Sequence, residues 1–324
     1  MKYAGSVALT FLLMPLANAD ISSRVYGGLN IAYQKAKTDN GTSVDIGSIG
    51  ARIYPGSYKI KAGQPKFEID QINGASYLEL DAEESDSVLD GVESKQTTNT
   101  LGGRLVLANR ELFIGAKLKE RAPESENPNF EMDVGRETEV SIGLRRGRLL
   151  SRYANATYSS ESSLYLGGRS DSFRFIQEDF YAVSDRKVDS HNLSFSWVGR
   201  TENKHIFVIQ SSFYQRNTNT NYRIQEYTRS TFPGADEDNQ PDPFLSDETE
   251  LEKDVMSYLG AGVSVTYYPS PDVLLNAGWF RFPEESPRVS VNSAVVLKDR
   301  FVISALASAG REAYRTALGA GVRF

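Results

Sequence analysis

Hydrophobic residues recur at every second position in many short segments of this chain. In "YLGAGVSVTYY", Leu259, Val263 and Tyr267 share one face with Ala261 and Val265, while Gly, Ser and Thr occupy the other. The same alternation is found in 24–34, 101–108, 138–146, 190–197 and 288–297. A period of two indicates β-strands with one apolar and one polar face. The sequence therefore predicts an all-β protein.

The composition of the polar face and the spacing of the strands decide between a soluble sandwich and a membrane barrel. The polar face is rich in Gly, Ser, Asn and Arg, which suits a wet interior. Tight gaps alternate with longer polar ones; the tight gaps lie at 109–110, 146–147, 199–202, 269–271 and 298–299, and the longer ones at 36–42, 83–98, 121–136 and 216–255. Membrane barrels have short periplasmic turns and longer external loops. We therefore expect a transmembrane antiparallel β-barrel.

The last eleven residues, "YRTALGAGVRF", keep the alternation from Tyr314 to Phe324. A barrel must pair its last strand with its first, because an open edge in lipid leaves backbone groups unsatisfied. This ending also resembles that of Gram-negative outer-membrane β-barrel proteins, which commonly finish on such a strand with a terminal Phe. The resemblance implies that the barrel-assembly machinery reads residues 314–324, and that the protein lies among lipid and lipopolysaccharide in the cell outer membrane.

An even strand number is expected if both ends of the barrel lie in the periplasm. We predict sixteen strands, near 23–35, 43–53, 74–82, 99–108, 111–120, 137–146, 148–158, 162–168, 172–181, 188–199, 203–215, 256–268, 272–282, 288–297, 300–309 and 313–324. A hairpin within 54–73 would give eighteen strands. If the short pair at 162–181 were one irregular loop, the number would be fourteen. A barrel of about this size is too wide to be filled by side chains and leaves an aqueous channel.

The N-terminus carries the three parts of a secretory signal. Lys2 precedes an apolar stretch, and Ala17-Asn18-Ala19 forms an A-x-A site, so we expect cleavage after Ala19 and a mature barrel of 20–324. Removal of Lys2 changes the formal charge from −6 to −7. An acidic exported protein is not a general binder of nucleic acid. The chain has no Cys, which excludes disulfides and a lipoprotein anchor.

Charged residues on the lumen-facing positions are the candidate site. Four neighbouring strands offer a basic wall, although the pattern leaves the facing of the fourth open, and the preceding strand offers carboxylates; the basic residues are Arg104, Lys117, Lys119, Arg145 and, on the fourth strand, Arg152, and the acidic ones Glu79 and Asp81. The connection 121–136 is by count the third external loop. It carries Glu124, Glu126, Glu131 and Asp133.

This arrangement resembles the general Gram-negative porins, which are sixteen-stranded trimeric channels whose third loop folds into the pore. The first strand, "VYGGLNIAY", is also similar to theirs, whereas no "PEFGG"-like motif occurs in the loop. The resemblance implies that acids of 121–136 face the basic wall across a constriction. It also implies a homotrimer and passive diffusion of small hydrophilic solutes and ions. A transverse charge field at a constriction sets ion preference. The alternative for 121–136 is a solvated external loop.

The segment 228–255 carries nine acids and one lysine between Asp236 and Asp254. We interpret it as a solvated surface loop rather than a collector of cations, because acidic runs of this kind are usually solvated. Its "DEDNQPD" stretch does not have the spacing of a calcium loop.

Two other classes of function compete with the channel. A barrel enzyme of the lipase or protease type needs a base, and the chain has only His191, expected on the lipid face, and His205, expected beside a periplasmic turn. No GxSxG, HExxH or phosphate-loop motif occurs, so we predict neither an enzyme nor a cofactor. A non-conducting adhesin or structural barrel is supported only by the long segment 216–255.

Overall fold

The protein is an antiparallel β-barrel. The computed structural model describes residues 28–38, 43–55, 63–89, 92–107, 109, 111–125, 129–171, 176–230, 242–281, 287–311 and 313–322. The predicted signal peptide and cleavage site, Glu126 and the terminal Phe324 lie outside the described residues. The strands are β1 (Gly28–Thr38), β2 (Ser43–Ile53), β3 (Tyr77–Leu89), β4 (Val92–Leu107), β5 (Leu112–Ser125), β6 (Phe130–Met132), β7 (Gly135–Arg146), β8 (Leu149–Asp171), β9 (Ile176–Arg200), β10 (Ile206–Ser230), β11 (Phe244–Ser270), β12 (Val273–Arg281), β13 (Arg288–Leu297), β14 (Phe301–Gly310) and β15 (Ala313–Val322).

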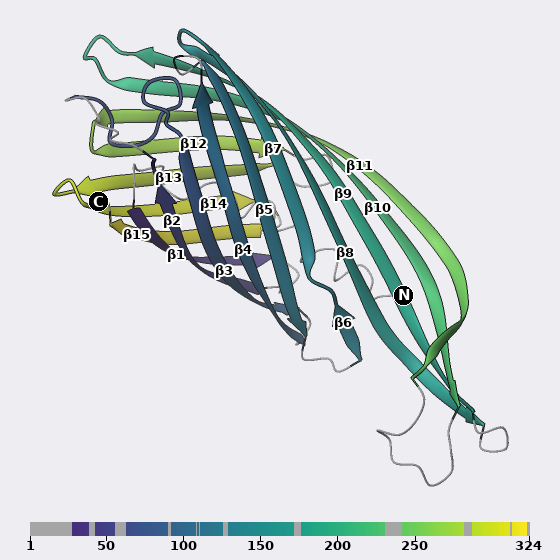
Figure 1. Ribbon diagram of the computed structural model, residues 1–324. Coiled ribbons are helices and arrows are strands. Elements are labelled where there is room, and N and C mark those ends of the chain that lie inside the picture. The colour runs from purple at the N-terminus through teal and green to yellow at the C-terminus, as the bar shows by residue number, and fades with distance from the viewer. Residues whose placement is uncertain are drawn as a thin grey trace.

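Fourteen of these strands close on themselves, and the short β6 pairs with β8 beside the ring (Figure 1). The first and last strands meet in one antiparallel ladder that runs from Leu29 opposite Val322 to Thr38 opposite Ala313. The pairing of β8 with β9 joins the two ends of the sheet. The predicted fold class is therefore confirmed, and the strand number is the lower of the alternatives. No helix among the described residues is long and apolar enough to cross a membrane.

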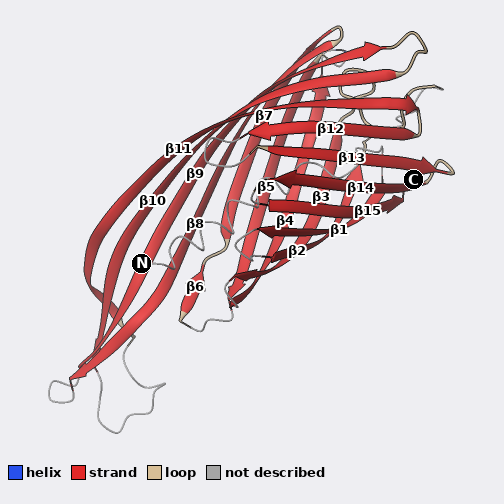
Figure 2. Ribbon diagram, turned by 180° about the vertical axis from the view of Figure 1, so that it is seen from behind, coloured by secondary structure: helices blue, strands red, loops and turns tan. Residues whose placement is uncertain are grey.

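The difference from sixteen strands lies in 148–199. The segments 162–168 and 176–181 do not form a separate pair, because they belong to β8 and β9, which have 23 and 25 residues; 172–175 lie outside the described residues. Likewise β10 and β11 have 25 and 27 residues. A spanning strand needs only about 9–11 residues. These four strands therefore extend well past the others, toward the lower right of Figure 1 and the lower left of Figure 2.

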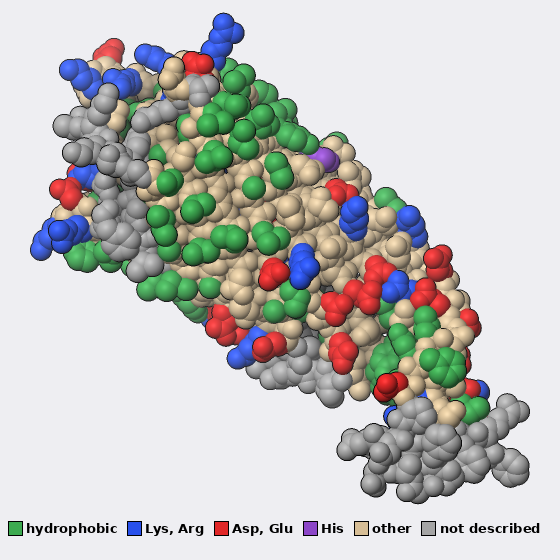
Figure 3. All heavy atoms as spheres, viewed as in Figure 1, with side chains coloured by type: hydrophobic (Ala, Val, Ile, Leu, Met, Phe, Trp, Pro, Cys, Tyr) green, Lys and Arg blue, Asp and Glu red, His purple; other side chains and the backbone are tan. Residues whose placement is uncertain are grey.

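The outer face of the closed part carries an apolar band. Large exposed side chains on it include Leu78 and Leu80 of β3, Leu101 and Leu105 of β4, Ile114 and Leu118 of β5, and Val140 and Ile142 of β7. Farther along the same face of β3 and β5 the side chains are charged, as at Glu84 and Glu120. Figure 3 shows hydrophobic side chains spread over the closed part and acidic ones gathered toward the extension. Exposed leucine and valine in a continuous band indicate contact with lipid.

The five predicted tight gaps lie at the same end of the barrel as the start of β1 and the end of β15, although two-residue connections also join β3 to β4 and β14 to β15 at the other end. At Lys298 and Asp299 both residues have positive φ (50° and 60°), the conformation of a tight hairpin turn. The connection between β2 and β3 lies at this same end, and it is the exception to the short turns. Its described part, 63–76, contains no strand element and carries fully buried side chains. By the rule of short periplasmic turns, this is the periplasmic end.

Candidate functional site

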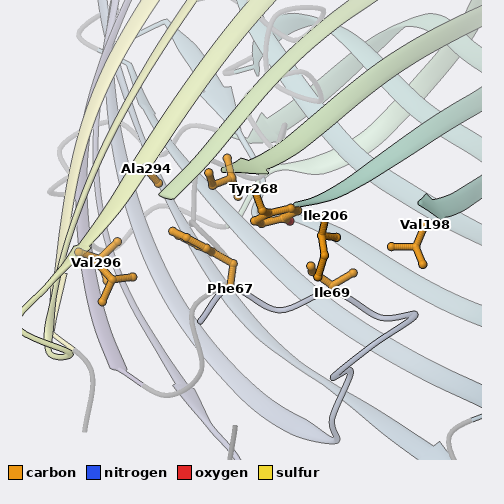
Figure 4. Packing of buried hydrophobic residues seen from close by; sticks show 9 residues of the cluster. Phe67, Ile69, Val198, Ile206, Tyr268, Ala294 and Val296 are labelled. Carbon is orange, nitrogen blue, oxygen red and sulfur yellow. The ribbon is translucent and has the colours of Figure 1, made fainter. Parts of the chain in front are cut away.

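The described part of the β2–β3 connection, residues 63–76, folds into the lumen, and we name it the inward connection. Phe67 and Ile69 project from it into an apolar cluster on the barrel wall, where Ile206, Tyr268 and Val296 are among their neighbours (Figure 4). The ring of Phe67 lies 6.0 Å from that of Tyr268, measured between centroids. The inward connection was predicted as a turn or a hairpin. The structure places it across the lumen instead.

Asn73 shapes the inward connection locally. Its side chain is fully buried and accepts a hydrogen bond from the Ile69 amide (2.5 Å) while donating to the carbonyls of Phe67 (2.9 Å) and Pro65 (3.0 Å). Gly74 follows at a point where a Cβ would lie 2.9 Å from the Asp70 backbone and 3.0 Å from the Phe113 ring. Such a tight approach admits glycine alone without a shift. The "NG" pair therefore turns the chain inside the lumen.

Ion pairs attach the inward connection to the wall on the side of β2 to β5. The Arg104 guanidinium contacts both Glu68 and Asp70, at 2.7 Å to the latter, and it also donates to the Ala75 carbonyl at 2.8 Å. Arg52 contacts Glu68 at 3.3 Å and Glu79 at 2.7 Å. Because Glu68 and Asp70 are buried, their charges need these partners.

Lys66 attaches the other side of the inward connection to two periplasmic turns. Its ammonium contacts Asp272, in the turn between β11 and β12, and Asp299, in the turn between β13 and β14. Hydrogen bonds to these two carboxylates raise the pKa of Lys66 above its usual value of 10.5. Since a raised pKa favours the charged form, this attachment is fully present below pH 10.5 and is lost only as the pH rises through the raised value.

The predicted basic wall residues do face the lumen, but with other partners than expected. Besides Arg104, Arg145 also reaches the inward connection, donating to the Gln71 carbonyl at 3.3 Å. Lys117 contacts Glu79 at 2.7 Å. Farther out, Lys119 contacts Glu137 at 2.7 Å and Arg152 contacts Glu139 at 3.4 Å. Asp81 follows Glu79 on the same face of β3, beside Gly50.

The acids of 121–136 do not form the opposite side of a constriction in the described residues. Glu124 ends β5 on the outer alternation with Leu118 and is exposed, because the strand continues to Ser125. Glu131 lies in β6, exposed, and Asp133 follows it and donates its amide to the Glu161 carbonyl at 2.9 Å. The expectation that this loop folds into the pore is therefore wrong for 121–125 and 129–136. The inward connection, and not this loop, contacts the basic wall inside the lumen.

The predicted loop 228–255 is also largely strand. Its residues 228–230 end β10, residues 244–255 begin β11, and 231–241 lie outside the described residues. From Phe244 to Leu251 every side chain of β11 is exposed, so the described acids of this segment are solvated.

The two histidines lie where the alternation predicts. His191 is on the outer face, with Nδ1 2.8 Å from the Tyr153 hydroxyl and 3.1 Å from the Asn155 amide nitrogen. His205, just before β10, contacts the Tyr267 hydroxyl. Each histidine thus contacts the hydroxyl of a tyrosine on a neighbouring strand, and His191 also contacts Asn155.

The residues that sequence reasoning missed are those of the inward connection, with Arg52 opposite them. A signal was present in "FEIDQING", in which Phe67 and Ile69 alternate with Glu68 and Asp70 ahead of a turn dipeptide. Large apolar side chains are usually buried rather than exposed in a turn, so this stretch indicated a buried segment.

No protein-family model and no curated protein sequence matches the chain. Among solved structures, the chain is similar to the outer membrane protein Omp33 of Acinetobacter baumannii, with 11% identity, a TM-score of 0.49, and coverage of 93% of this chain and 100% of the other. It is also similar to the translocator domain of autotransporter NalP from Neisseria meningitidis, with 10% identity, a TM-score of 0.46, and coverage of 99% and 98%. Neither likeness supports a specific activity.

Proposed function

We propose that the protein is an outer-membrane channel for passive diffusion of small hydrophilic solutes and ions, and that the inward connection limits its conductance. The observation that carries the proposal is a closed barrel with a charged interior whose described obstruction is one short segment. A fourteen-stranded barrel is wider than the eight-stranded barrels that side chains can fill. The inward connection contacts the wall through a small apolar cluster and ion pairs.

Planar-bilayer conductance tests the channel. The purified full chain is compared with a variant in which residues 63–74 are replaced by a flexible Gly/Ser linker, and with Arg136→Gln, on the outer face of β7, as control. We expect conductance in all three, and a several-fold larger single-channel step in the linker variant, because its lumen is wider. If neither the full chain nor the linker variant conducts, the channel proposal fails and a non-conducting adhesin or structural barrel is favoured.

Arg104→Ala and Arg145→Ala test the role of the basic wall in the same assay. Each removes a group that contacts the inward connection. We expect larger or noisier conductance steps than in the wild type, because the inward connection loses an attachment. Unchanged conductance and ion preference in both variants would show that these two residues are not part of the constriction.

The location and partners that we propose follow from the C-terminal segment 314–324 and from the closed barrel with its apolar outer face. The outer membrane, with its lipid and lipopolysaccharide, is the usual location of a closed apolar-faced barrel in Gram-negative bacteria. Recognition of 314–324 by the assembly machinery is part of the same proposal. The homotrimer rests only on the resemblance to sixteen-stranded porins, and chemical cross-linking in native membranes tests it.

A further inference from the structure

The external half of the lumen carries arginines from strands all around the barrel. We name Arg121, Arg186, Arg216, Arg288 and Arg315 the arginine collar; they lie on β5, β9, β10, β13 and β15. Each shares the face of its strand with buried lumen-side residues, as Arg315 does with Ala317 and Arg288 with Ala294. Except for Arg121 they are only partly buried, so a solute in the lumen can reach them.

Members of the collar lie near each other and near tyrosines of nearby strands. Arg186 is within electrostatic range of Arg121 and of Tyr158, Tyr222 and Tyr258. The Arg121 guanidinium carbon lies 5.1 Å from the centre of the Tyr158 ring. A guanidinium over an aromatic face is held in place by the cation–π attraction, which fixes its orientation. This part of the collar therefore combines arginines with tyrosine rings, and Arg121 is oriented by one of them.

A second pair of arginines lies on the opposite wall. Arg315 is within electrostatic range of Arg288 and Glu83, and it also donates to the Gln34 side chain. Glu83 in turn lies within electrostatic range of Arg121, Lys119 and Arg315, and Lys119 and Arg121 also contact Glu137. Both walls thus carry arginines that face the lumen.

Cations outnumber acids along the lumen. Around the inward connection, the four cations Arg52, Arg104, Lys117 and Arg145 exceed the three acids Glu68, Asp70 and Glu79 by one. In the external half, on the described strands, the collar and Lys119 make six cations, and the inward-facing carboxylates beside them are five: Asp81, Glu83, Glu137, Glu252 and Asp254. The lumen is therefore positive in a chain whose formal charge is −6.

Acids on the outer face do not cancel this excess. Glu84, Glu120 and Glu124 lie outside the lumen, across the wall from the collar. The Debye length is about 8 Å at physiological salt, so exposed charges farther away are screened, whereas charges inside a narrow lumen are screened less. The field that a solute meets on entering is therefore set by the collar.

We propose that the arginine collar is a binding site for small anions, so that the channel selects solutes that carry carboxylate, phosphate or sulfonate groups. The proposal rests on the channel function. Arginine presents a planar fork of donors that matches such groups in two-point contact, and rings of basic side chains are the known basis of anion-selective pores. The tyrosine rings between the arginines offer an apolar surface to the carbon part of an organic anion.

Two measurements test the collar, one of which needs no conductance. The first is the reversal potential of the full chain in a KCl gradient across a planar bilayer. We expect a chloride-to-potassium permeability ratio of about 3 or more, since a cleft of one charge sign concentrates its counter-ions. The second is fluorescence anisotropy of the trianion pyranine added to the folded protein in a nonionic detergent. We expect saturable binding that inorganic phosphate displaces.

The test variant is Arg186→Gln/Arg288→Gln, with Arg136→Gln as the matched control. Heat-dependent migration on a gel shows that each variant is folded. The double variant should lower the permeability ratio about threefold and weaken pyranine binding by about tenfold, because two guanidinium groups that can make two-point contacts with an anion are lost. The control should change neither. A conducting channel that prefers potassium overturns the collar and leaves the channel function intact. Pyranine binding without conductance, lost in the double variant, supports the collar and overturns the channel. The collar is overturned if the full chain shows neither chloride preference nor pyranine binding. It is also overturned if the double variant keeps both.

Discussion

Asn73 shows how much of the lumen depends on one side chain. It makes three hydrogen bonds to the backbone of residues 65–69, all within the inward connection. A buried amide of this kind substitutes for the missing strand ladder, because each backbone group inside the lumen needs a partner. The position of Phe67 and of the acids that contact Arg104 follows from it.

We expect Asn73→Ala to loosen the inward connection while the barrel stays folded. Each buried backbone group left without a partner costs about 1–3 kcal/mol, and several are affected at once. Single-channel recordings should show larger or more frequent openings than in the wild type. The control is Asn276→Ala, which removes a lumen-facing asparagine whose contacts are with Thr266 and Val265 of the wall. Equal behaviour of the two variants would contradict the role given to Asn73.

Glu161, on the part of β8 beyond the apolar band, carries a perturbed carboxyl group. A hydrogen bond to Asp185 is the main cause that raises its pKa above 4.5, although Arg223 contacts both acids. Since the folded state holds this proton more tightly than the unfolded chain, the protonated form adds stability below pH 4.5. That contribution is lost as the pH rises through the raised pKa.

A carbon-13 NMR titration of the Glu161 carboxyl checks this. We expect a midpoint above 4.5 in the wild type and a lower midpoint in Asp185→Asn, because the second carboxylate is gone and Arg223 remains. Asp247→Asn, farther out on β11, is the control and should leave the midpoint in place. A wild-type midpoint below 4.5 would show that Arg223, not Asp185, dominates at this site.

At the scale of elements, the strands that face lipid are the ones that the sequence predicts well. Segments such as 99–108 and 137–146 alternate because one face meets lipid and the other water. Beyond the membrane both faces meet water, so the alternation fades, and 83–98 and 216–255 are interpreted as loops although they are mostly strand. The inward connection could not be placed from local pattern, since its attachments join positions far apart, such as Lys66 and Asp299.

The outer part of β11 is an edge strand. Residues 244–260 pair with β10, and β12 joins β11 only from Ala261 onward, within the described residues. We expect amide hydrogen exchange at least about tenfold faster in 244–258 than in 262–268, because a two-sided ladder has to open on both sides before exchange. Mass spectrometry of the protein in detergent measures this. Equal protection of the two segments would mean that a further strand covers the edge.

The whole molecule depends on the pairing of β1 with β15. In lipid this pairing satisfies the backbone groups of both strands, so the barrel holds only if the ends of the chain meet. The ladder fixes a specific register in which Tyr33 lies opposite Leu318, both on the outer face. Closure also creates the wide lumen on which the channel and the arginine collar rest.

Cysteine cross-linking across this seam tests the closed barrel most directly, because the chain has no native Cys. Directly opposite residues of antiparallel strands lie about 4.5–5.5 Å apart between Cα atoms, within the range that a disulfide bridges. Oxidation of Tyr33→Cys/Leu318→Cys should give an intramolecular bond in high yield, seen as a mobility shift that reductant reverses, whereas Tyr33→Cys/Tyr314→Cys, four positions out of register, should not. Failure of the first pair to join, or equal joining by the second, would contradict the closed barrel in this register.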